Sequence, residues 1–255
     1  MKKHESYARV ALVTGATSGI GEATARRFVA AGFGVVGSGR NAAKLKQLEV
    51  ELGNSFSGFA GDIAEEGMVN KLFAAAAKCF GKTPDIVVAN AGRGLGGSVK
   101  DADLSRYESI LKVNVSSTLA LLQRAAREML PRQEKGYPET AADIVVVGSV
   151  VGRHISPFSA VYGSTKFAVH ALAEGLRREL GPKGVRVTLV EPGITISGFQ
   201  DAAGYSDAMV QNFEDKFGPL LVAEDVADTI QYVVSLPPRV HVSDIVVRPT
   251  RQDYP

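Results

Sequence analysis

Short runs of β-branched and other apolar residues alternate along the chain with longer segments whose apolar residues recur at helical spacing. The apolar runs occupy 9–13, 33–38, 55–60, 85–90, 143–149, 185–192 and 240–247. Helical patterns cover 22–32, 41–52, 65–80, 103–130 and 159–181. Strands that are apolar on both faces belong to parallel sheets covered by helices on both sides. The pattern therefore predicts one doubly wound α/β domain over 1–255, with a seven-stranded parallel sheet.

The composition places few constraints on possible partners. Hydrophobic residues make up 45% of the chain and charged residues 22%, as in an ordinary soluble globular protein. The formal net charge is +2 and the basic residues are scattered, so nucleic acid is not expected as a partner. Cys79 is the only cysteine, so we expect neither an intrachain disulfide nor a cysteine metal cluster.

Signals for export or membrane insertion are not expected either. The basic start MKKHESYARVALV carries an apolar run that is short and ends in a glycine loop, unlike a signal peptide. No apolar run reaches the roughly 18 residues of a membrane-spanning helix. A cytoplasmic location fits these features best.

The ends of the predicted strands indicate where a ligand would bind. Doubly wound sheets bind ligands in the crevice beyond the carboxyl ends of their strands. The segments that follow the predicted strands include 14–21, 37–40, 62, 90–92, 149 and 192–197. Candidate binding residues are therefore sought in these segments.

The segment VTGATSGIGEA follows the first predicted strand and opens the first helix. Its glycines follow a G-x-x-x-G-x-G spacing. Glycines permit a tight turn and let backbone N–H groups approach a pyrophosphate, and the helix amino end adds about half a positive charge. A plain turn between strand and helix is the alternative, which the position at the first junction disfavours. The expected dinucleotide contacts are Gly15, Thr17, Ser18, Gly19, Ile20 and Gly21.

The end of the second predicted strand, GVVGSGRN, bears on the choice of cofactor. A dinucleotide fold that prefers NAD usually has an acidic residue here, which binds the adenosine ribose. Gly39 occupies that place and makes room, while Arg40 offers a forked cation suited to a 2′-phosphate. NADP(H) is therefore favoured over NAD(H), with Ser38 and Asn41 as further phosphate donors. A solvated arginine that caps the loop is the alternative for Arg40.

Asp62, in the segment GDIAEEG, follows the third predicted strand. Its carboxylate is suited to the amino end of the next helix, where it would act as an N-cap. It is equally suited to the amino group of adenine. Both roles stay open, since different atoms of Asp62 can serve them.

Together these residues resemble the short-chain dehydrogenase/reductase family. The matching segments, in the family's order, are TGATSGIG, Asp62, NAG at 90–92, Asn114 in LKVNVSS, Ser149, YGSTK at 162–166 and PG at 192–193. They spread over about 180 residues, and the strand–helix pattern matches over nearly the whole chain. The resemblance implies a Rossmann-type seven-stranded sheet, a nicotinamide dinucleotide, and hydride transfer between an alcohol and a carbonyl.

Tyr162 and Lys166 carry the predicted proton transfer. Their spacing puts both side chains on one helix face, although the Tyr-x-x-x-Lys motif alone is weak. In reduction Tyr162 would donate a proton to the substrate oxygen, and in oxidation its phenolate would accept one. A cation about 4 Å away, at an effective dielectric near 20, lowers the pKa of a phenol by about 3 units. We therefore expect Lys166 to lower the pKa of Tyr162.

Ser149 and Asn114 complete the predicted catalytic set. The Ser149 hydroxyl, at the end of the fifth strand, would hold the substrate oxygen beside Tyr162, and a strand-end turn serine is the alternative. Asn114 interrupts a predicted helix, where asparagine is a mediocre helix former. The resemblance implies that Asn114 disturbs this helix and positions a water that links Lys166 to solvent. A polar residue satisfied between helices is the alternative.

The resemblance implies further cofactor contacts. It assigns the backbone near Ile194, in EPGITISGF, to the nicotinamide carboxamide, and Lys166 to the nicotinamide ribose. Ser197 stands where the family often has threonine, and it keeps the hydroxyl. The other implied contacts are Asp62, Ile63, Asn90, Ala91, Gly92, Tyr162, Pro192 and Gly193. The cofactor-binding half would be about 1–150 and the catalytic half about 150–255.

Signals for the substrate are weaker. The segment HVSDIVVRPTRQDYP lacks the glycine-rich tail of the 3-oxoacyl-carrier-protein reductase branch and looks more like the branch acting on serine, other 3-hydroxy acids or small carbonyl compounds. Arg93 and Arg153 on crevice loops could bind a substrate carboxylate, and solvated loop arginines are the alternative. A mobile lid is expected over about 194–220, with Phe199, Met209 and Phe213 covering the substrate.

Three classes of function remain. An NADP(H)-dependent oxidoreductase for a small alcohol or carbonyl substrate is favoured, with a 3-oxoacyl-carrier-protein reductase-like enzyme as an alternative. A dinucleotide-sensing binding protein would be expected to have lost part of the catalytic set, which is complete here. A scaffold with purely structural glycines is the third class. The resemblance favours a homotetramer or homodimer, and the connection over 132–143, predicted to be long and exposed, has no assigned function.

Overall fold

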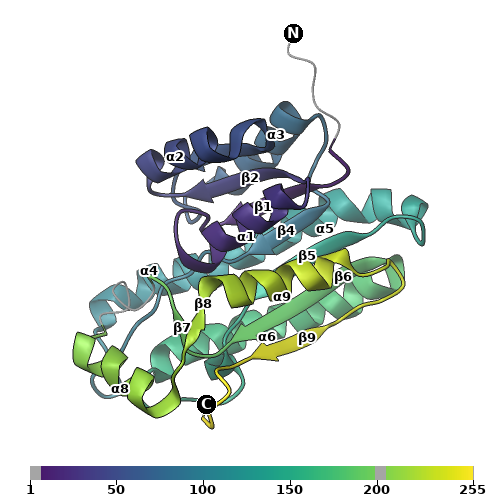
Figure 1. Ribbon diagram of the computed structural model, residues 1–255. Helices are drawn as coiled ribbons and strands as arrows, with labels where there is room; N and C mark the ends of the chain where they lie inside the picture. Colours follow the sequence, from purple (N-terminus) through teal and green to yellow (C-terminus); the bar gives the residue numbers. More distant parts are fainter. Residues whose placement is uncertain (1–6, 199–204, 255) are drawn as a thin grey trace.

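A seven-stranded parallel sheet forms the centre of the molecule (Figure 1). The computed structural model describes residues 7–198 and 205–254. Within these ranges the strand order is β3-β2-β1-β4-β5-β6-β9, and every neighbouring pair is parallel. The strands are β1 Val10–Thr14, β2 Gly34–Gly39, β3 Phe56–Ala60, β4 Ile86–Ala89, β5 Ala142–Val147, β6 Val185–Pro192 and β9 Asp244–Val247. The predicted α/β fold with a Rossmann-type sheet is confirmed.

Both faces of the sheet are apolar, as expected for strands that are covered on two sides. Along β1, Val10 and Leu12 point into one core cluster, whereas Ala11 and Val13 point into the other. All four side chains are fully buried. This two-residue alternation explains why the strands read in the sequence as continuous apolar runs.

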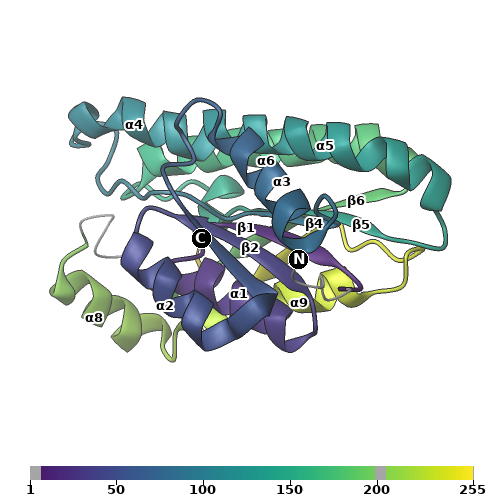
Figure 2. The same ribbon diagram turned by 90° about the horizontal axis from the view of Figure 1, so that it is seen from above.

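Helices cover both faces of the sheet (Figure 2). One layer consists of α3 Met68–Phe80, α5 Ser117–Gly136 and α6 Ala160–Leu180, and the other of α1 Gly19–Ala30, α2 Ala42–Leu52 and α9 Ala223–Ser235. Helix α9 was not predicted, although its buried residues Val226, Ile230 and Val233 recur at helical spacing. It packs against α1 and completes its layer. Short 3₁₀ turns occur at Gly53–Ser55, Val150–Gly152 and Gly181–Lys183.

The helix predicted over 103–130 is interrupted in the structure. It consists of a 3₁₀ turn at Leu104–Arg106, α4 at Tyr107–Leu111, a π-helical turn at Lys112–Ser116, and then α5. The buried Asn114 lies in the π-helical turn, so the helix is disturbed at this residue, as expected. Turns of this kind are rare and occur frequently at functional sites.

The prediction of a long exposed connection over 132–143 is wrong. Helix α5 continues through Pro131 to Gly136 and β5 begins at Ala142, which leaves only residues 137–141 between them. Proline has no amide hydrogen, so one helical hydrogen bond is lost at this point while the neighbouring turns continue. The buried Gln133 beyond it donates from Nε2 to the Thr140 carbonyl oxygen at 2.6 Å and ties the helix end to the segment before β5.

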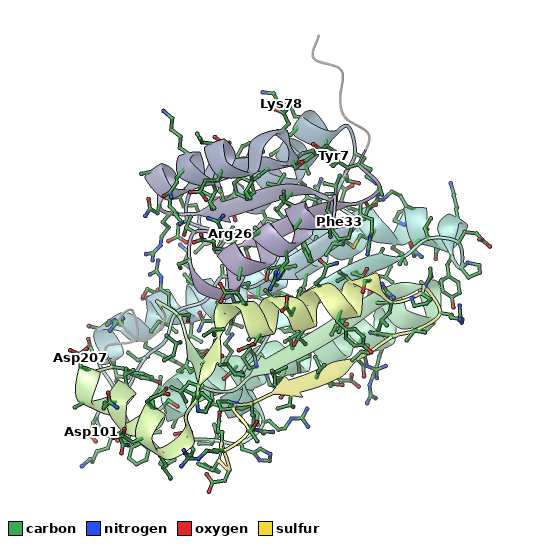
Figure 3. The ribbon with its side chains drawn as sticks, viewed as in Figure 1. Tyr7, Arg26, Phe33, Lys78, Asp101 and Asp207 are labelled. Atoms are coloured by element: carbon green, nitrogen blue, oxygen red, sulfur yellow. The ribbon has the colours of Figure 1, made fainter. Side chains whose placement is uncertain are left out.

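A small sheet and a helix lie at the end of the molecule toward which the main strands point (Figure 1). Strand β7, Thr195–Ile196, pairs in parallel with β8, Leu221–Val222, and α8, Asp207–Phe217, lies between them in the sequence. These elements fall in or beside the predicted lid, whereas Phe199 lies outside the described residues. Figure 3 shows Asp207 and Asp101 at this end of the molecule, away from Tyr7 and Lys78.

Candidate active site

A cleft of about 620 Å³ opens at the carboxyl ends of the strands. The strand order changes direction between β1 and β4, where doubly wound sheets bind their ligands. Most of the predicted site residues line this cleft, although they are far apart in the sequence. Those lining it are Gly15, Thr17, Ser18, Gly19, Ile20, Ser38, Gly39, Arg40, Asp62, Ile63, Asn90, Ala91, Gly92, Arg93, Ser149, Tyr162, Lys166, Pro192, Gly193, Ile194, Ser197, Met209 and Phe213.

The glycine loop between β1 and α1 forms one wall of the cleft. Gly15 has a φ of 69°, a left-handed conformation that favours glycine. A Cβ atom at Gly21 would lie 2.2 Å from the Gly15 carbonyl oxygen, so only glycine lets α1 start so close to the loop. Asn90, after β4, donates from Nδ2 to the Thr14 carbonyl oxygen at 2.9 Å. Gly21 lies outside the cleft lining and determines how closely the loop and α1 approach. Asn90 ties the loop to β4, the strand beside β1 in the sheet.

Two features of the cleft suit the phosphates of a dinucleotide. Ser18 is the N-cap of α1, and its side chain makes no capping hydrogen bond, so the N–H groups of the first helical turn are not capped by this side chain. Such an amino end is a ready anion site. Arg40 lines the cleft after β2, is exposed, and forms no ion pair with any residue that the structure describes. The residues present therefore fit a phosphorylated dinucleotide.

The connection between β2 and α2 differs from the prediction in two respects. A Cβ atom at Gly39 would come within 2.6 Å of the Thr17 side chain, so the space beside this glycine is filled by the glycine loop. Asn41 lies outside the cleft lining, and its Oδ1 accepts from the Lys44 backbone N–H at 3.0 Å. Asn41 therefore caps α2, and the structure gives no support for a phosphate contact from its side chain.

Asp62 lines the cleft after β3 but does not cap the following helix. Helix α3 begins at Met68, with Gly67 as its N-cap. One Asp62 carboxylate oxygen accepts from the Ala64 backbone N–H at 2.9 Å, and the other pairs with the Arg93 guanidinium at 3.1 Å. The N-cap alternative is therefore wrong. Asp62 shapes a turn and holds Arg93 toward the β3 side of the cleft.

Tyr162 lies on α6 and faces the cleft, with 8% of its surface exposed. A side-chain hydrogen bond joins it to Ser149, which follows β5. Burial raises the pKa of the Tyr162 phenol, the nearby Tyr205 raises it further, and the hydrogen bond with Ser149 opposes the rise. The phenol is therefore protonated at neutral pH, which is the form that can donate a proton.

Lys166 lies one helical turn beyond Tyr162. Its Nζ donates to the Val147 carbonyl oxygen at 2.8 Å and lies 5.8 Å from the centre of the Tyr162 ring. Burial lowers the pKa of Lys166 to about 8. The expected lowering of the Tyr162 pKa by Lys166 is not seen in this structure: burial is the largest cause acting on the phenol, and the group that lowers its pKa is Ser149.

Asn114, in the π-helical turn, connects two segments of the site. Its Oδ1 accepts from the Arg93 backbone N–H at 2.8 Å, and its Nδ2 donates to the Arg93 carbonyl oxygen at 2.9 Å. Nδ2 also donates to Thr165 Oγ1 at 3.0 Å, beside Lys166 on α6. Asn114 is buried and lies outside the cleft lining. Its side-chain amide is hydrogen-bonded between two elements, which matches the alternative of a polar residue satisfied between helices. These bonds also hold the segment after β4 against α6.

A buried group that was not predicted lies behind Ser149. The Ser149 backbone N–H donates to His170 Nε2 at 3.3 Å, so His170 carries its hydrogen on Nδ1, which faces Glu191 Oε2 at 3.7 Å. Glu191 is fully buried and accepts from Arg153 Nε at 2.9 Å. Burial lowers the pKa of His170 to about 4. The sequence gives no signal for this chain of contacts, which supports the Ser149 backbone.

Arg153 is therefore not placed where it was predicted. It lies outside the cleft lining, and its Nε and Nη2 donate to the two carboxylate oxygens of Glu191. Its expected contact with a substrate carboxylate has no support in the structure. The physical reason is that a fully buried glutamate requires a charge partner, and Arg153 is within reach.

The chain's last residues also line the cleft, and this was not predicted. Gln252 is 6% exposed, and its Oε1 accepts from the Ile194 backbone N–H at 2.9 Å. The Tyr254 hydroxyl donates to the Ile155 carbonyl oxygen. Within the backbone near Ile194 that the family resemblance assigns to the nicotinamide carboxamide, the Ile194 N–H thus binds a side-chain amide of the protein itself. Other lining residues that were not predicted include Phe158, Tyr205 and Lys216.

The described residues contain no group of three histidine, cysteine, aspartate or glutamate side chains placed to hold a metal ion. Over the same ranges, no helix has both the length and the apolarity needed to cross a bilayer.

Comparisons with known proteins agree with this geometry. Residues 9–206 match the family model for short chain dehydrogenases. The chain is 34% identical over 245 residues to a serine 3-dehydrogenase of Agrobacterium fabrum, covering 95% of this chain and 94% of that protein. It is 31% identical to an uncharacterized oxidoreductase of Staphylococcus epidermidis, over 94% of this chain and 97% of the relative.

Solved structures share the fold. The closed form of a serine dehydrogenase complexed with NADP+ gives a TM-score of 0.84 at 29% identity and covers 96% of each chain. A 3-ketoacyl-(acyl-carrier-protein) reductase from Brucella melitensis complexed with NADH gives 0.86 at 28% identity, covering 96% of this chain and 98% of that one. With the family model matching most of the chain and a relative above 30% identity over nearly its full length, the protein belongs to the short-chain dehydrogenase/reductase family of NAD(P)-dependent oxidoreductases that act on CH–OH groups.

Proposed function

We propose that this enzyme transfers a hydride between NADP(H) and a small alcohol or carbonyl substrate, with Tyr162 as general acid and base. The observation that supports this most directly is a buried, protonated Tyr162 that hydrogen-bonds Ser149 and lies beside Lys166 in the cleft. Bound nicotinamide supplies the hydride in reduction and accepts it in oxidation. The protein's own residues hold the substrate oxygen and move the proton.

The three side chains divide this task. In reduction, the Tyr162 hydroxyl gives its proton to the substrate oxygen as negative charge develops there. The Ser149 hydroxyl, which hydrogen-bonds Tyr162, holds the same substrate oxygen. Lys166, with a pKa of about 8, is largely protonated at neutral pH and stabilises the phenolate that remains. In oxidation the same steps run in reverse.

NADP(H) is the proposed cofactor, in preference to NAD(H). The support comes from Arg40, an exposed guanidinium at the end of β2 that lines the cleft. Among proteins of the same fold, the serine dehydrogenase structure contains NADP+ and the reductase structure contains NADH. For this chain, Arg40 and the absence of an acidic residue at Gly39 favour NADP(H).

A 3-oxoacyl-carrier-protein reductase-like activity is the second candidate, because the Brucella reductase shares the fold at 28% identity. A dinucleotide-sensing role is less favoured, since Ser149, Tyr162 and Lys166 all line the cleft. The homotetramer or homodimer that the family resemblance implies stays a prediction, as does a cytoplasmic location.

Tyr162→Phe tests the proton-transfer role. The change removes the hydroxyl and keeps the ring, so turnover should fall at least about a hundredfold while the cofactor still binds. The measurements are kcat for a carbonyl substrate at saturating NADPH, and NADPH binding followed by its fluorescence. Tyr232→Phe, on the exposed side of α9, is the matched control and should keep wild-type turnover. Near-normal turnover in Tyr162→Phe would refute the assignment.

A further inference from the structure

The part of the cleft that α8 covers has an aromatic wall. Met209, Phe213 and Phe217 follow one another at intervals of four residues along α8, and all three line the cleft. The Phe213 ring centre lies 6.2 Å from that of Tyr205 and 6.5 Å from that of Phe217. Tyr205 and Tyr162 both line the cleft, and Tyr205 contributes to the raised pKa of the Tyr162 phenol. The aromatic row therefore extends toward the proposed proton donor.

Two more aromatic residues leave apolar surface open in the cleft. Phe158 is 75% exposed, although its backbone is held by a hydrogen bond from the Gly97 N–H to the Phe158 carbonyl oxygen at 2.9 Å. Tyr254 is 49% exposed, and its hydroxyl is tied to the Ile155 carbonyl oxygen. Exposed apolar surface in the wall of a cleft is typical of a ligand site. A ligand with an apolar group would cover these rings.

The arginines that could bind a substrate carboxylate have other partners or lie at another part of the cleft. Arg153 is outside the cleft lining and paired with Glu191. Arg93 pairs with Asp62 on the β3 side of the cleft. Arg40 lines the cleft at the end of β2, where the adenosine phosphate is proposed to bind. Among the described residues, therefore, no arginine that lines the cleft lies at the α8 end with a guanidinium available to bind a substrate carboxylate.

Two lysines also line the cleft. Lys166 donates to the Val147 carbonyl oxygen and belongs to the proton-transfer group. The Lys216 Nζ lies 4.7 Å from the centre of the Phe217 ring, so this cation is stacked on the aromatic row. A lysine is a single point charge and lacks the forked geometry that binds a carboxylate through two hydrogen bonds. Lys216 is therefore the rival anchor for an acidic substrate, and it can be tested separately.

We propose that the substrate is a ketone, or the corresponding secondary alcohol, with an aromatic or branched apolar group a few atoms from the carbonyl carbon and with no carboxylate. This inference rests on the proposed function, because Tyr162 and Ser149 must bind the carbonyl oxygen. The apolar group packs against the aromatic row and Phe158. In reduction the carbonyl carbon gains the hydride of NADPH, which becomes NADP+, and the oxygen gains the proton of Tyr162. The substrate class thus differs from the serine named for the relatives.

Three ketones of related shape test this inference. Benzylacetone and levulinate share one carbon chain that ends in a phenyl ring or a carboxylate, and butanone lacks both groups. Burial of the phenyl ring should raise kcat/KM for benzylacetone about 10- to 100-fold above that for butanone, and levulinate should be no better than butanone. A kcat/KM for levulinate equal to or above that for benzylacetone overturns the inference. Faster oxidation of serine than of the alcohol of benzylacetone does the same.

Two variants identify the residues that carry the preference. Phe213→Leu should lower the ratio of kcat/KM for benzylacetone to kcat/KM for butanone several-fold. Phe167→Leu, an exposed phenylalanine on α6 outside the cleft lining, is the matched control and should keep the wild-type ratio. An unchanged ratio in a Phe213→Leu protein that melts like the wild type counts against the inference. Selective loss of levulinate reduction in Lys216→Met would show a carboxylate anchor and overturn it.

Failure of the proposed function gives a different result. In that case the wild type turns over the three ketones and serine no faster than Tyr162→Phe does, with either cofactor. A binding measurement needs no turnover: benzylacetone should raise the melting temperature of the protein more than levulinate at equal concentration. Greater stabilisation by levulinate would overturn the apolar assignment even in an inactive protein.

Discussion

Tyr162, Lys166 and His170 occupy successive turns of α6, and burial acts on each of them. It raises the pKa of Tyr162, lowers that of Lys166 to about 8 and lowers that of His170 to about 4. In every case burial shifts the equilibrium toward the neutral form, because removal from water penalises charge, although Lys166 stays largely protonated at pH 7. The geometry uses these forms: a protonated phenol can donate to a substrate, and a neutral imidazole accepts the Ser149 N–H.

His170 predicts how stability depends on pH. Its pKa is lowered from 6.5 to about 4 by folding, so between these values the unfolded chain binds a proton that the folded protein excludes. The free energy of unfolding is therefore retained above about pH 6.5 and falls as the pH drops toward 4. Because solvent screens part of the ring, this residue contributes about 1–3 kcal/mol to the fall. His170→Gln keeps an acceptor for the Ser149 N–H but does not titrate, so the fall should become smaller.

Urea unfolding at several pH values within this window measures the effect. His154→Gln, which changes an exposed histidine outside the network, is the matched control and should keep the wild-type dependence on pH. His241, whose pKa burial also lowers, contributes equally in all three proteins and drops out of the comparison. An identical dependence on pH in His170→Gln and the wild type would contradict the prediction.

At the scale of elements, the strands and the loops at their ends were predictable, because their sequences are dictated by the backbone. A buried parallel strand must be apolar on both faces, and the turn at Gly15 must accept a positive φ. Helix α9 was missed although its spacing was visible, and α5 was ended too early because proline usually stops a helix. Packing of Gln133 beyond Pro131 overrides that local preference.

Long-range partners account for the errors within the site. Arg153 and Glu191 are separated by 38 positions in the sequence, and the spacing gives no sign that they would bind each other. The same holds for Gln252 and Ile194, which meet only because the tail folds back on the loop after β6. The sequence therefore locates the motif residues. It does not predict where each charged side chain points, because that depends on which partner the fold brings near.

The β2–α2 connection carries the prediction for cofactor choice. Arg40→Ala removes the cation proposed for the 2′-phosphate, a charge-assisted contact of about 1.5–3 kcal/mol. The preference for NADPH over NADH in kcat/KM should therefore fall about 10- to 150-fold, with little change for NADH itself. This variant is cleaner than a change at Gly39, where any side chain would meet Thr17.

The measurement is kcat/KM for both cofactors at one saturating ketone and fixed salt. Lys46→Ala, which removes an exposed charge from α2, is the matched control and should keep the wild-type ratio. A wild-type preference for NADH would refute the assignment. An unchanged ratio in Arg40→Ala would place the discrimination in Ser38 or in the backbone.

At the scale of the whole molecule, the two ends of the sheet have different tasks. The carboxyl ends of the strands form the cleft, whereas Asp143, near the start of β5, binds both Arg9 and Arg186. Arg186 also donates to the carbonyl oxygens of Val234 and Leu236, at the end of α9. This buried charge cluster joins the entry to β1, two central strands and α9. It holds elements that are far apart in the sequence at the end of the sheet opposite the cleft.

The charge cluster predicts that stability and activity can be separated. Asp143 lies 2.7 Å from Arg186 Nε, and their side chains are only 3% and 5% exposed. Asp143→Asn leaves the buried Arg186 without its counter-charge, which should lower the free energy of unfolding by about 3–5 kcal/mol. At about 3.3 Å per residue along β5, the change lies on the order of 15 Å from the end of the strand at the cleft. The protein that remains folded should therefore keep kcat and KM near their wild-type values.

Urea unfolding and ketone reduction, measured at one low temperature where Asp143→Asn is still folded, test both parts of this prediction. Asp228→Asn is the matched control, because Asp228 pairs with Arg27 on the surface, where both side chains are about half exposed. Solvent screens that pair, so its loss should cost less than about 1 kcal/mol. Equal losses of stability in the two variants would mean that the buried Asp143 cluster contributes no more to the free energy of unfolding than an exposed ion pair does. Intact stability with reduced kcat in Asp143→Asn would mean that the cluster acts on the cleft, and would contradict the predicted separation of stability from activity.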